Sequence, residues 1–309
     1  MTHAFVKHIL LFVLGLYWSV MPRLLCAQGE QFQLVYKFEP NQFVHCEVAH
    51  KMTIEIKLGE ASQTTYNESK SRKHLRVVAV DQHGNAVLEP MIDHVRMTAK
   101  SEQETVVFNS TDGPDKCPPA FQHVLKTIGQ PLTRVKVAAN GRLLSLGNEY
   151  VQQKGGNSIH ESDASRNFLV VFPEKPVRIG AAWHDDINVP VEVSAKLKRQ
   201  ITLRRTYRLM AVKDSIAIIG LKTAVLEPIR DPQIKAQLIQ RAPVGTIRFD
   251  IQMGQIASWE SNIDKVVVGA FGLNSSMRAI SYRSERRLNL AQIAEKQDGS
   301  NSANHTQKQ

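Results

Sequence analysis

The sequence is poor in the residues that mark specialised classes of protein. It has only 3 cysteines among 309 residues, together with 17 glycines and 13 prolines. A disulfide scaffold or a collagen-like chain needs far more of one or the other, so both classes are excluded. A hydrophobic content of 42% also excludes a wholly disordered chain. A chain of this length can bury roughly three quarters of its unfolded surface, so its core needs neither a metal nor a disulfide.

The sequence also lacks the common catalytic motifs. It contains no GxxxxGK[ST] phosphate loop, no GxSxG nucleophile elbow, no HExxH or CxxC, and no EF-hand loop. We therefore interpret the chain as non-enzymatic and expect no cofactor. An enzyme with dispersed active-site residues stays open as the alternative, because catalytic triads are recognised by geometry and not by sequence order.

The one long apolar run lies near the N-terminus and is short. Residues 9–20 (ILLFVLGLYWSV) follow Lys7 with no acid before them. A membrane-spanning helix needs about 20 apolar residues, so the run is typical of a signal peptide. We predict cleavage after Ala27, which leaves no transmembrane helix in the mature chain and places the protein outside the cytoplasm, periplasmic or secreted. A lipoprotein acylated at Cys26 and an uncleaved anchor are the alternatives.

The charge balance is basic, with a formal net charge of +10. Removal of residues 1–27 would lower it only to +8, since that segment carries two basic residues and no acid. Export would leave Cys46 and Cys117 in an oxidising compartment, where they are candidates for a disulfide. The competing interpretation is that Cys46, which alternates with Val44 and Val48, is simply a small buried residue.

Alternating apolar and polar residues dominate the chain from residue 32 onward. Residues 76–88 (RVVAVDQHGNAVL) and 207–219 (YRLMAVKDSIAII) each predict a strand, a tight turn and a return strand. The fold class is therefore mainly β. We predict a two-copy architecture of antiparallel curved sheets, half-barrel or barrel-like, each with one short α-helix.

Four residues that recur 113 positions later suggest an internal repeat. They are Pro119, Leu125, Thr133 and Gly141, which return as Pro232, Leu238, Thr246 and Gly254. Each set predicts a helix followed by a hairpin, the hairpins spanning residues 134–146 and 247–259. Asp231 is expected to cap the second helix. Asn140-Gly141 supplies the positive φ angles of a type I′ turn, for which Met253-Gly254 is a poorer match.

The repeat defines the predicted domain organisation. The two β-rich copies span residues 31–147 and 168–285, joined by a polar linker over residues 148–167. Residues 289–309 have too few apolar side chains to pack, and we predict a disordered tail there.

Several phrases of the sequence resemble a known family. They are YKFEP at 36–40, EVAHKMT at 47–53, PEKPV at 173–177 leading to Trp183, and GTIRFD at 245–250. The chain looks like a family of secreted proteins of unknown function that is common in planctomycete bacteria. The resemblance covers most of residues 31–285. It implies an exported protein and supplies no activity or catalytic residues.

Candidate metal or catalytic residues are sparse. His184, Asp185 and Asp186 form the densest cluster, because an imidazole and carboxylates can share a metal or act as base and orienter. Only His184 and Asp186 project to one strand face, which makes them weak metal candidates, and a solvated strand end is the competing interpretation.

One further pair of histidines and one pair of an aspartate with a histidine are weaker candidates. His45 and His50 are five positions apart, so on a regular strand they point to opposite faces and cannot share a metal without a bulge. Asp93 and His94 are interpreted as a surface strand end. We therefore predict no metal site.

The segment 195–209 (AKLKRQITLRRTYRL) is rich in basic residues and has no acid. On a continuous strand one face carries Lys196, Lys198, Arg204 and Arg208. This face could bind an anionic polysaccharide or envelope lipid, whereas export makes nucleic acid an improbable partner. The alternative is a solvated face whose charge protects the strand from edge pairing.

Four aromatic residues, Trp183, Tyr207, Phe249 and Trp259, are candidates for lining an apolar pocket inside a curved sheet. Ordinary core packing is the alternative. Together these features favour an exported, non-enzymatic binding or structural component of the cell envelope, with an apolar or anionic ligand. The alternative function is an extracytoplasmic hydrolase.

Overall fold

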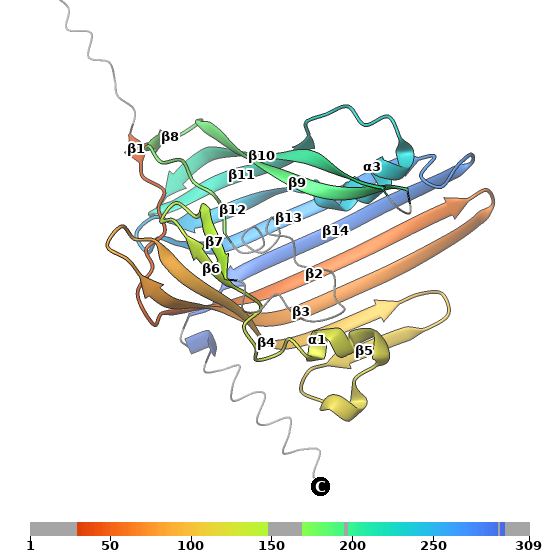
Figure 1. Ribbon diagram of the computed structural model, residues 1–309, viewed down its shortest axis with the longest axis horizontal. Coiled ribbons are helices and arrows are strands. Elements are labelled where there is room, and N and C mark those ends of the chain that lie inside the picture. Colours follow the sequence, from red (N-terminus) through yellow and green to blue (C-terminus); the bar gives the residue numbers. More distant parts are fainter. Residues whose placement is uncertain (1–29, 148–168, 195–196, 290, 294–309) are drawn as a thin grey trace, which may run out of the picture. The chain divides into compact units, whose positions relative to one another are not determined.

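The structure is a computed structural model that describes residues 30–147, 169–194, 197–289 and 291–293. The predicted leader, the linker, most of the predicted tail and Lys196 lie outside these residues. Within them, no helix is long and apolar enough to cross a membrane. Strands dominate, as the sequence predicts, and nearly all of them belong to one antiparallel sheet of 12 strands (Figure 1).

The strands follow the chain in a regular order. In the large sheet the neighbours run β7-β6-β4-β3-β2-β14-β13-β12-β11-β10-β9, with β5 paired to β4, while β1 and β8 form a separate pair. The strands are β1 (Gln31–Phe32), β2 (Phe43–Leu58), β3 (Ala61–Val80), β4 (Ala86–Lys100), β5 (Thr105–Asn109), β6 (Arg134–Val137), β7 (Leu143–Gly147), β8 (Val177–Arg178), β9 (Ala182–Ser194), β10 (Leu197–Lys213), β11 (Ile216–Val225), β12 (Val244–Asp250), β13 (Gln255–Val268) and β14 (Ser275–Arg287).

The two predicted sheets are one continuous, open sheet. β14 joins them, because it pairs with β2 along one side and with β13 along the other. β7 and β9 are the edges, and the sheet does not close. Two runs of strands, β2 to β7 without β5 and β9 to β13, have the same order of neighbours. Their origin as two copies of one unit stays a prediction.

Local turn chemistry explains the hairpins. Between β3 and β4, Asp81 Oδ1 accepts hydrogen bonds from the backbone N–H groups of His83 and Asn85, both at 3.0 Å. Between β6 and β7, only Gly141 has a positive φ (+86°), whereas Asn140 does not. The predicted type I′ turn is therefore wrong. The register shifts by one residue beside this turn, which is how a glycine-containing bulge closes a longer hairpin loop.

The helical segments are η1 (Pro114–Lys116), η2 (Pro119–Phe121), α1 (Gln122–Leu125), α3 (Pro232–Leu238) and η4 (Ile239–Arg241). Asp231 caps α3 as predicted, accepting a 2.8 Å hydrogen bond from the Gln233 N–H. The first predicted helix is shorter than the apolar stripe of the sequence, which runs through Phe121, Val124, Leu125 and Ile128. It ends because Ile128 forms a bridge with Ile92 of β4, and the next N–H, of Gly129, donates to the Ile92 carbonyl at 2.9 Å.

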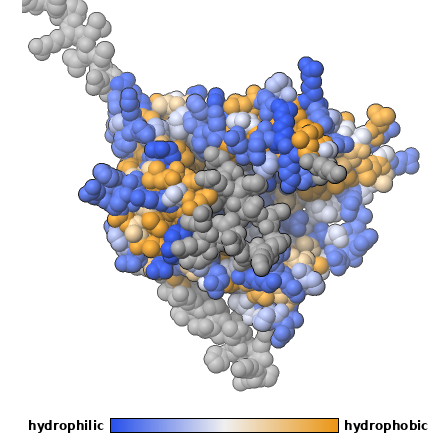
Figure 2. Space-filling view, viewed as in Figure 1, coloured by the Kyte–Doolittle hydropathy of each residue, from blue (hydrophilic) through white to orange (hydrophobic). Residues whose placement is uncertain are grey.

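The main core lies where the two ends of the sheet approach each other. Residues of β3, β4 and β6 pack in one cluster with residues of β10, β11 and β12, and the segments around residues 34–36 and 169–172 belong to the same cluster. Smaller clusters lie under η4, under α3 and beside η2. In the space-filling view, apolar residues show in patches between hydrophilic ones (Figure 2). The core therefore holds the far ends of the sheet together around two extended segments.

Candidate functional site

A cavity of about 210 Å³ lies beside the main core. Its wall is formed by the extended segment that contains Tyr36 and Phe38, by strands β2, β3 and β4, and by strands β13 and β14. The apolar side chains of the wall are Tyr36, Phe38, Val44, Leu75, Pro90, Met91, Leu132, Leu169 and Ile256, and the polar or ionisable ones are Cys46, Lys73, His74, Thr133, Gln255, Arg283, Glu285 and Arg287.

The strand register places several of these side chains on one face of the sheet. Cys46 of β2 lies directly opposite Lys73 of β3, and Val44 lies opposite Leu75. On the other side of β2, Arg287 of β14 lies opposite Cys46. Directly opposed residues of antiparallel strands point to the same face. Three neighbouring strands therefore contribute one continuous wall.

Tyr36 fixes the segment that closes the cavity. Its hydroxyl donates to the Val170 carbonyl at 3.1 Å and accepts from the Val170 N–H at 2.8 Å. The ring stacks on Phe38, with ring centroids 5.4 Å apart. Burial raises the pKa of Tyr36 far above its usual value, so the hydroxyl stays protonated. The two extended segments are thus bonded to each other inside the core.

Two hairpin glycines allow these segments to approach. A Cβ on Gly141 would lie 2.4 Å from the Val170 carbonyl oxygen, and one on Gly254 would lie 2.4 Å from the Lys37 backbone nitrogen. Both glycines also have positive φ angles. These positions match in the predicted repeat, and each one brings a hairpin turn against the segment that closes the cavity.

The ionisable groups of the wall carry one surplus cation. Arg283 pairs with Glu285 at 2.5 Å and lies over the Trp259 ring, with its guanidinium 5.5 Å from the ring centroid. Arg287 pairs with Asp250 at 3.3 Å. Within the described part of the chain, Lys73 has neither a hydrogen bond nor an ion pair. Burial, followed by the charge of Arg283, lowers its pKa.

The thiol of Cys46 adds no charge to this wall. Burial raises the pKa of Cys46 well above its usual value, so the thiol is neutral at physiological pH. Both Cys46 and Cys117 are free, and Cys117 packs elsewhere, with Val95 and Phe108 beside η2. The predicted disulfide is therefore not formed in this structure, because strand pairing places the two thiols in different packing clusters.

The volume and chemistry of the cavity limit what it can hold. A cavity of about 150 Å³ is enough for a benzene-sized molecule, whereas drug-sized ligands occupy roughly 300 Å³ or more. At about 210 Å³ the cavity suits a compact apolar molecule. Lys73 offers such a molecule a cationic anchor at the wall.

The four predicted aromatic residues lie next to the cavity and not in its wall. Tyr207, Phe249 and Trp259 are buried in the main core, and Trp183 packs against it, stacking on Tyr207 with ring centroids 5.7 Å apart. Their main role in the structure is core packing. The prediction missed Lys73, whose signal was a lysine placed two positions before Leu75 on an apolar strand face.

Of the predicted basic face, Lys198, Arg204 and Arg208 lie on β10, whereas Lys196 is outside the described residues. Acids from β9 neutralise part of this face. Lys198 lies 3.7 Å from Glu192, and Arg204 donates two hydrogen bonds of 2.7 Å to the carboxylate of Asp186. These hydrogen bonds lower the pKa of Asp186. Arg208 follows on the same exposed face. The stripe is therefore at least in part a ladder of cross-strand ion pairs.

The same pairing corrects the weak metal candidates His184 and Asp186. They do share the exposed face of β9, but both oxygens of Asp186 accept hydrogen bonds from Arg204. A metal ion would have to displace this guanidinium. Within the described residues, the group of histidine and acidic side chains with metal-like spacing lies elsewhere, on β2, β3 and β4.

No protein-family model and no curated protein matches the sequence. Among solved structures, the chain is similar to one described as "Lipid-protein interactions in lipovitellin", with 9% identity and a TM-score of 0.44 over 82% of this chain; the match spans 25% of the lipovitellin chain. It is also similar to DynF from the dynemicin biosynthesis pathway of Micromonospora chersina, with 6% identity and a TM-score of 0.23, covering 86% of this chain and 89% of DynF. At TM-scores below 0.5, neither likeness supports an inference about function.

Proposed function

We propose that this is a binding protein that holds a compact apolar molecule with an acidic group in the cavity between β2, β3, β14 and the segment around Tyr36. The observation that carries the proposal is Lys73, a cation without an ion-pair partner in the described part of the chain, in a largely apolar wall whose two arginines are paired with acids.

The energetic argument has two parts. An ammonium group removed from water without a partner is costly, and a carboxylate or phosphate beside it would remove that cost. The apolar wall stabilises the rest of such a ligand by about 25 cal/mol for each Å² removed from water. A ligand with an apolar body and an anionic group contacts both the apolar side chains of the wall and Lys73. A neutral ligand leaves the charge of Lys73 without a partner.

The location and origin of the protein belong to the same proposal. The N-terminal apolar run supports export from the cytoplasm, and the phrases at 36–40 and 245–250 support kinship with the secreted planctomycete family. The equal order of neighbours in the two runs of strands supports a two-copy origin. A hydrolase at His184, Asp185 and Asp186 is not proposed, since none of the three lines the cavity.

Octanoate and octanol test the proposal, because they share a chain and differ in charge. Isothermal titration of the purified full chain should show octanoate binding more tightly than octanol. In the variant Lys73→Met, the preference for octanoate should disappear while octanol binding persists. Lys70→Met is the matched control, since Lys70 lies on the same strand with 67% of its side chain exposed. Equal affinities for the two probes, or an unchanged preference in Lys73→Met, would contradict the proposal.

The natural occupant can be sought directly. Organic extraction and mass spectrometry of the protein purified from its own host should yield a small apolar acid in near-stoichiometric amount. The variant Leu75→Trp fills the cavity from β3 and should lose it. An acid that co-purifies equally with this variant binds elsewhere, and that result counts against the cavity.

A further inference from the structure

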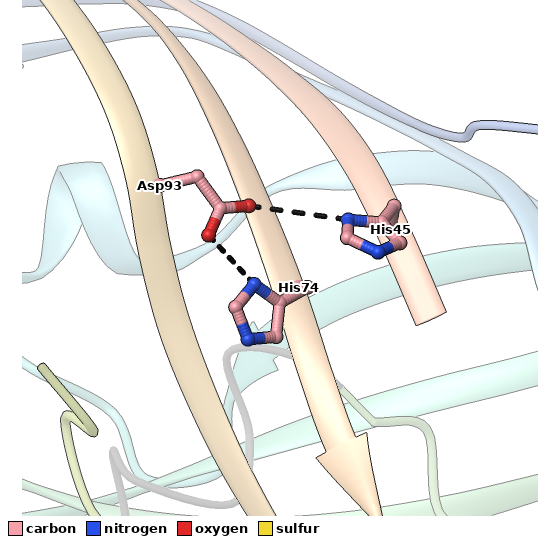
Figure 3. Close-up of side chains that lie close together, drawn as sticks. All are labelled: His45, His74 and Asp93. Atoms are coloured by element: carbon pink, nitrogen blue, oxygen red, sulfur yellow. Dashed lines mark hydrogen bonds and ion pairs between the residues drawn. The ribbon is translucent and has the colours of Figure 1, made fainter. Parts of the chain in front are cut away.

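Three side chains on neighbouring strands come together beside the cavity, on the face of β2 and β3 opposite to Cys46 and Lys73. One of them, His74, also lines the cavity. His45 of β2 lies directly opposite His74 of β3, so both rings project from the same face. Asp93 comes from β4, on the other side of β3 (Figure 3). The sequence prediction dismissed His45 and Asp93 as separate strand residues.

A β-bulge brings Asp93 to this face. Along β3 and β4 the pairing runs from Arg72 opposite His94 to Lys73 opposite Ile92, so Asp93 is the extra residue of β4. An extra residue breaks the strict alternation of a strand and redirects its side chain. Asp93 therefore points to the two imidazoles, as Figure 3 shows.

The possible ligand atoms of the three side chains lie close together. Asp93 Oδ1 lies 2.6 Å from His74 Nδ1, and Asp93 Oδ2 lies 4.0 Å from His45 Nδ1. One ligand atom from each of the three residues lies within 4.8 Å of the others. A metal bound at about 2.0–2.2 Å from each atom holds them no more than roughly 4.4 Å apart, so contraction by a few tenths of an ångström is enough.

We infer that His45, His74 and Asp93 bind a divalent transition-metal ion, with Zn²⁺ as the best match. Two imidazoles and one carboxylate suit zinc and its first-row neighbours, whereas magnesium and calcium prefer all-oxygen sites. Three protein ligands leave a fourth position for water. The partly exposed carboxylate gives the ion access from solvent, since 33% of the Asp93 side chain is exposed.

An apolar ring borders the cluster. The Phe43 ring lies 5.4 Å from the His74 ring and 6.3 Å from that of His45. The His74 side chain is only 11% exposed, whereas Asp93 is 33% exposed. The cluster therefore has an apolar side and a side that solvent can reach.

Zinc binding by the tag-free full chain tests the inference. Titration with Zn²⁺ alone should reveal a site that is lost, or weakened at least about 100-fold, in Asp93→Asn and in His74→Gln, since even changes beyond the ligands cost 10- to 100-fold. His94→Gln is the matched control, because His94 is the next residue along β4 and its ring bonds to Asn109 instead. Co²⁺ in place of Zn²⁺ should give the visible absorption of a low-coordinate nitrogen and oxygen site.

The outcomes separate this site from the cavity. Asp93→Asn should retain its octanoate binding while losing zinc, and Lys73→Met should do the reverse. If His74→Gln fails to fold, His45→Gln replaces it, because the His45 side chain is 29% exposed. Zinc affinity unchanged in Asp93→Asn, or no zinc binding by the wild-type chain at micromolar concentrations, would overturn the inference and leave a hydrogen-bonded strand pair.

Discussion

Replacing Tyr36 by phenylalanine should destabilise the fold by about 2–3 kcal/mol. The change removes a single oxygen, but that oxygen makes both hydrogen bonds between Tyr36 and the Val170 backbone. A typical hydrogen bond contributes about 1 kcal/mol net, and a buried group left without a partner costs about 1–3 kcal/mol. Two such bonds give the stated magnitude.

The structure supports the upper part of this range. Val170 is fully buried, so water cannot replace the lost hydroxyl. The phenyl ring would keep its ring contacts with Phe38, Phe172 and Phe249, whose centroids lie 5.4, 5.2 and 5.5 Å from that of Tyr36. The apolar area buried on folding is then unchanged, and so is the m-value.

Urea unfolding followed by circular dichroism measures the effect. Tyr36→Phe should lower the midpoint at constant m-value, while the control Tyr282→Phe should leave it unchanged, since Tyr282 is 47% exposed. A loss below about 0.5 kcal/mol, equal to that of the control, would refute the reasoning. It would mean that the segment around residue 170 is not held by this hydroxyl in solution.

Three further predictions concern stability. Because burial raises the pKa of Tyr36, the folded state keeps a proton that the unfolded state loses above pH 10, so wild-type stability should fall there by up to about 1.4 kcal/mol per pH unit, and less in Tyr36→Phe. Lys73→Met should raise the urea midpoint at pH 7, and the gain should shrink as pH approaches 10.5, where the unfolded lysine also becomes neutral. Gly254→Ala should cost more than Gly272→Ala in a thermal melt, since both have positive φ but only Gly254 abuts Lys37.

The parts of the fold set by local chemistry could be predicted from the sequence. The turn at Asp81 and the helix start at Asp231 each depend on a side chain that bonds backbone groups two to four residues away. The alternation of β10 likewise predicts which residues are buried, from Ile201 to Leu209. In each case the physical cause lies within a few residues of its effect.

The parts set by distant pairing could not be predicted. The sheet is continuous because β14 pairs with both β2 and β13. No local feature of the β14 sequence specifies either pairing. The helical segment that begins at Pro119 ends early because Ile128 forms a β-bridge with Ile92 of β4. Tertiary pairing there overrides an apolar stripe that by itself favours a longer helix.

The candidate sites show the same division. Large aromatic residues such as Phe249 and Trp259 are conspicuous in the sequence, but in the structure they are buried and pack in the main core. Tyr36 is bonded to a partner 134 positions away, and that distance hides its role. Lys73 is an ordinary strand residue in the sequence, and only the neighbouring strands show that it is partly buried in the cavity wall.

One bulge connects the two proposed sites. If the pairing that places Arg72 opposite His94 continued without interruption, the next pair would be Lys73 opposite Asp93. The lysine and the carboxylate would then share a face and neutralise each other. The extra residue in β4 instead turns Asp93 to the histidines and leaves Lys73 in the cavity wall without a partner. Both proposals therefore depend on a single irregularity of register, which strand alternation in the sequence cannot reveal because it assumes that none exists.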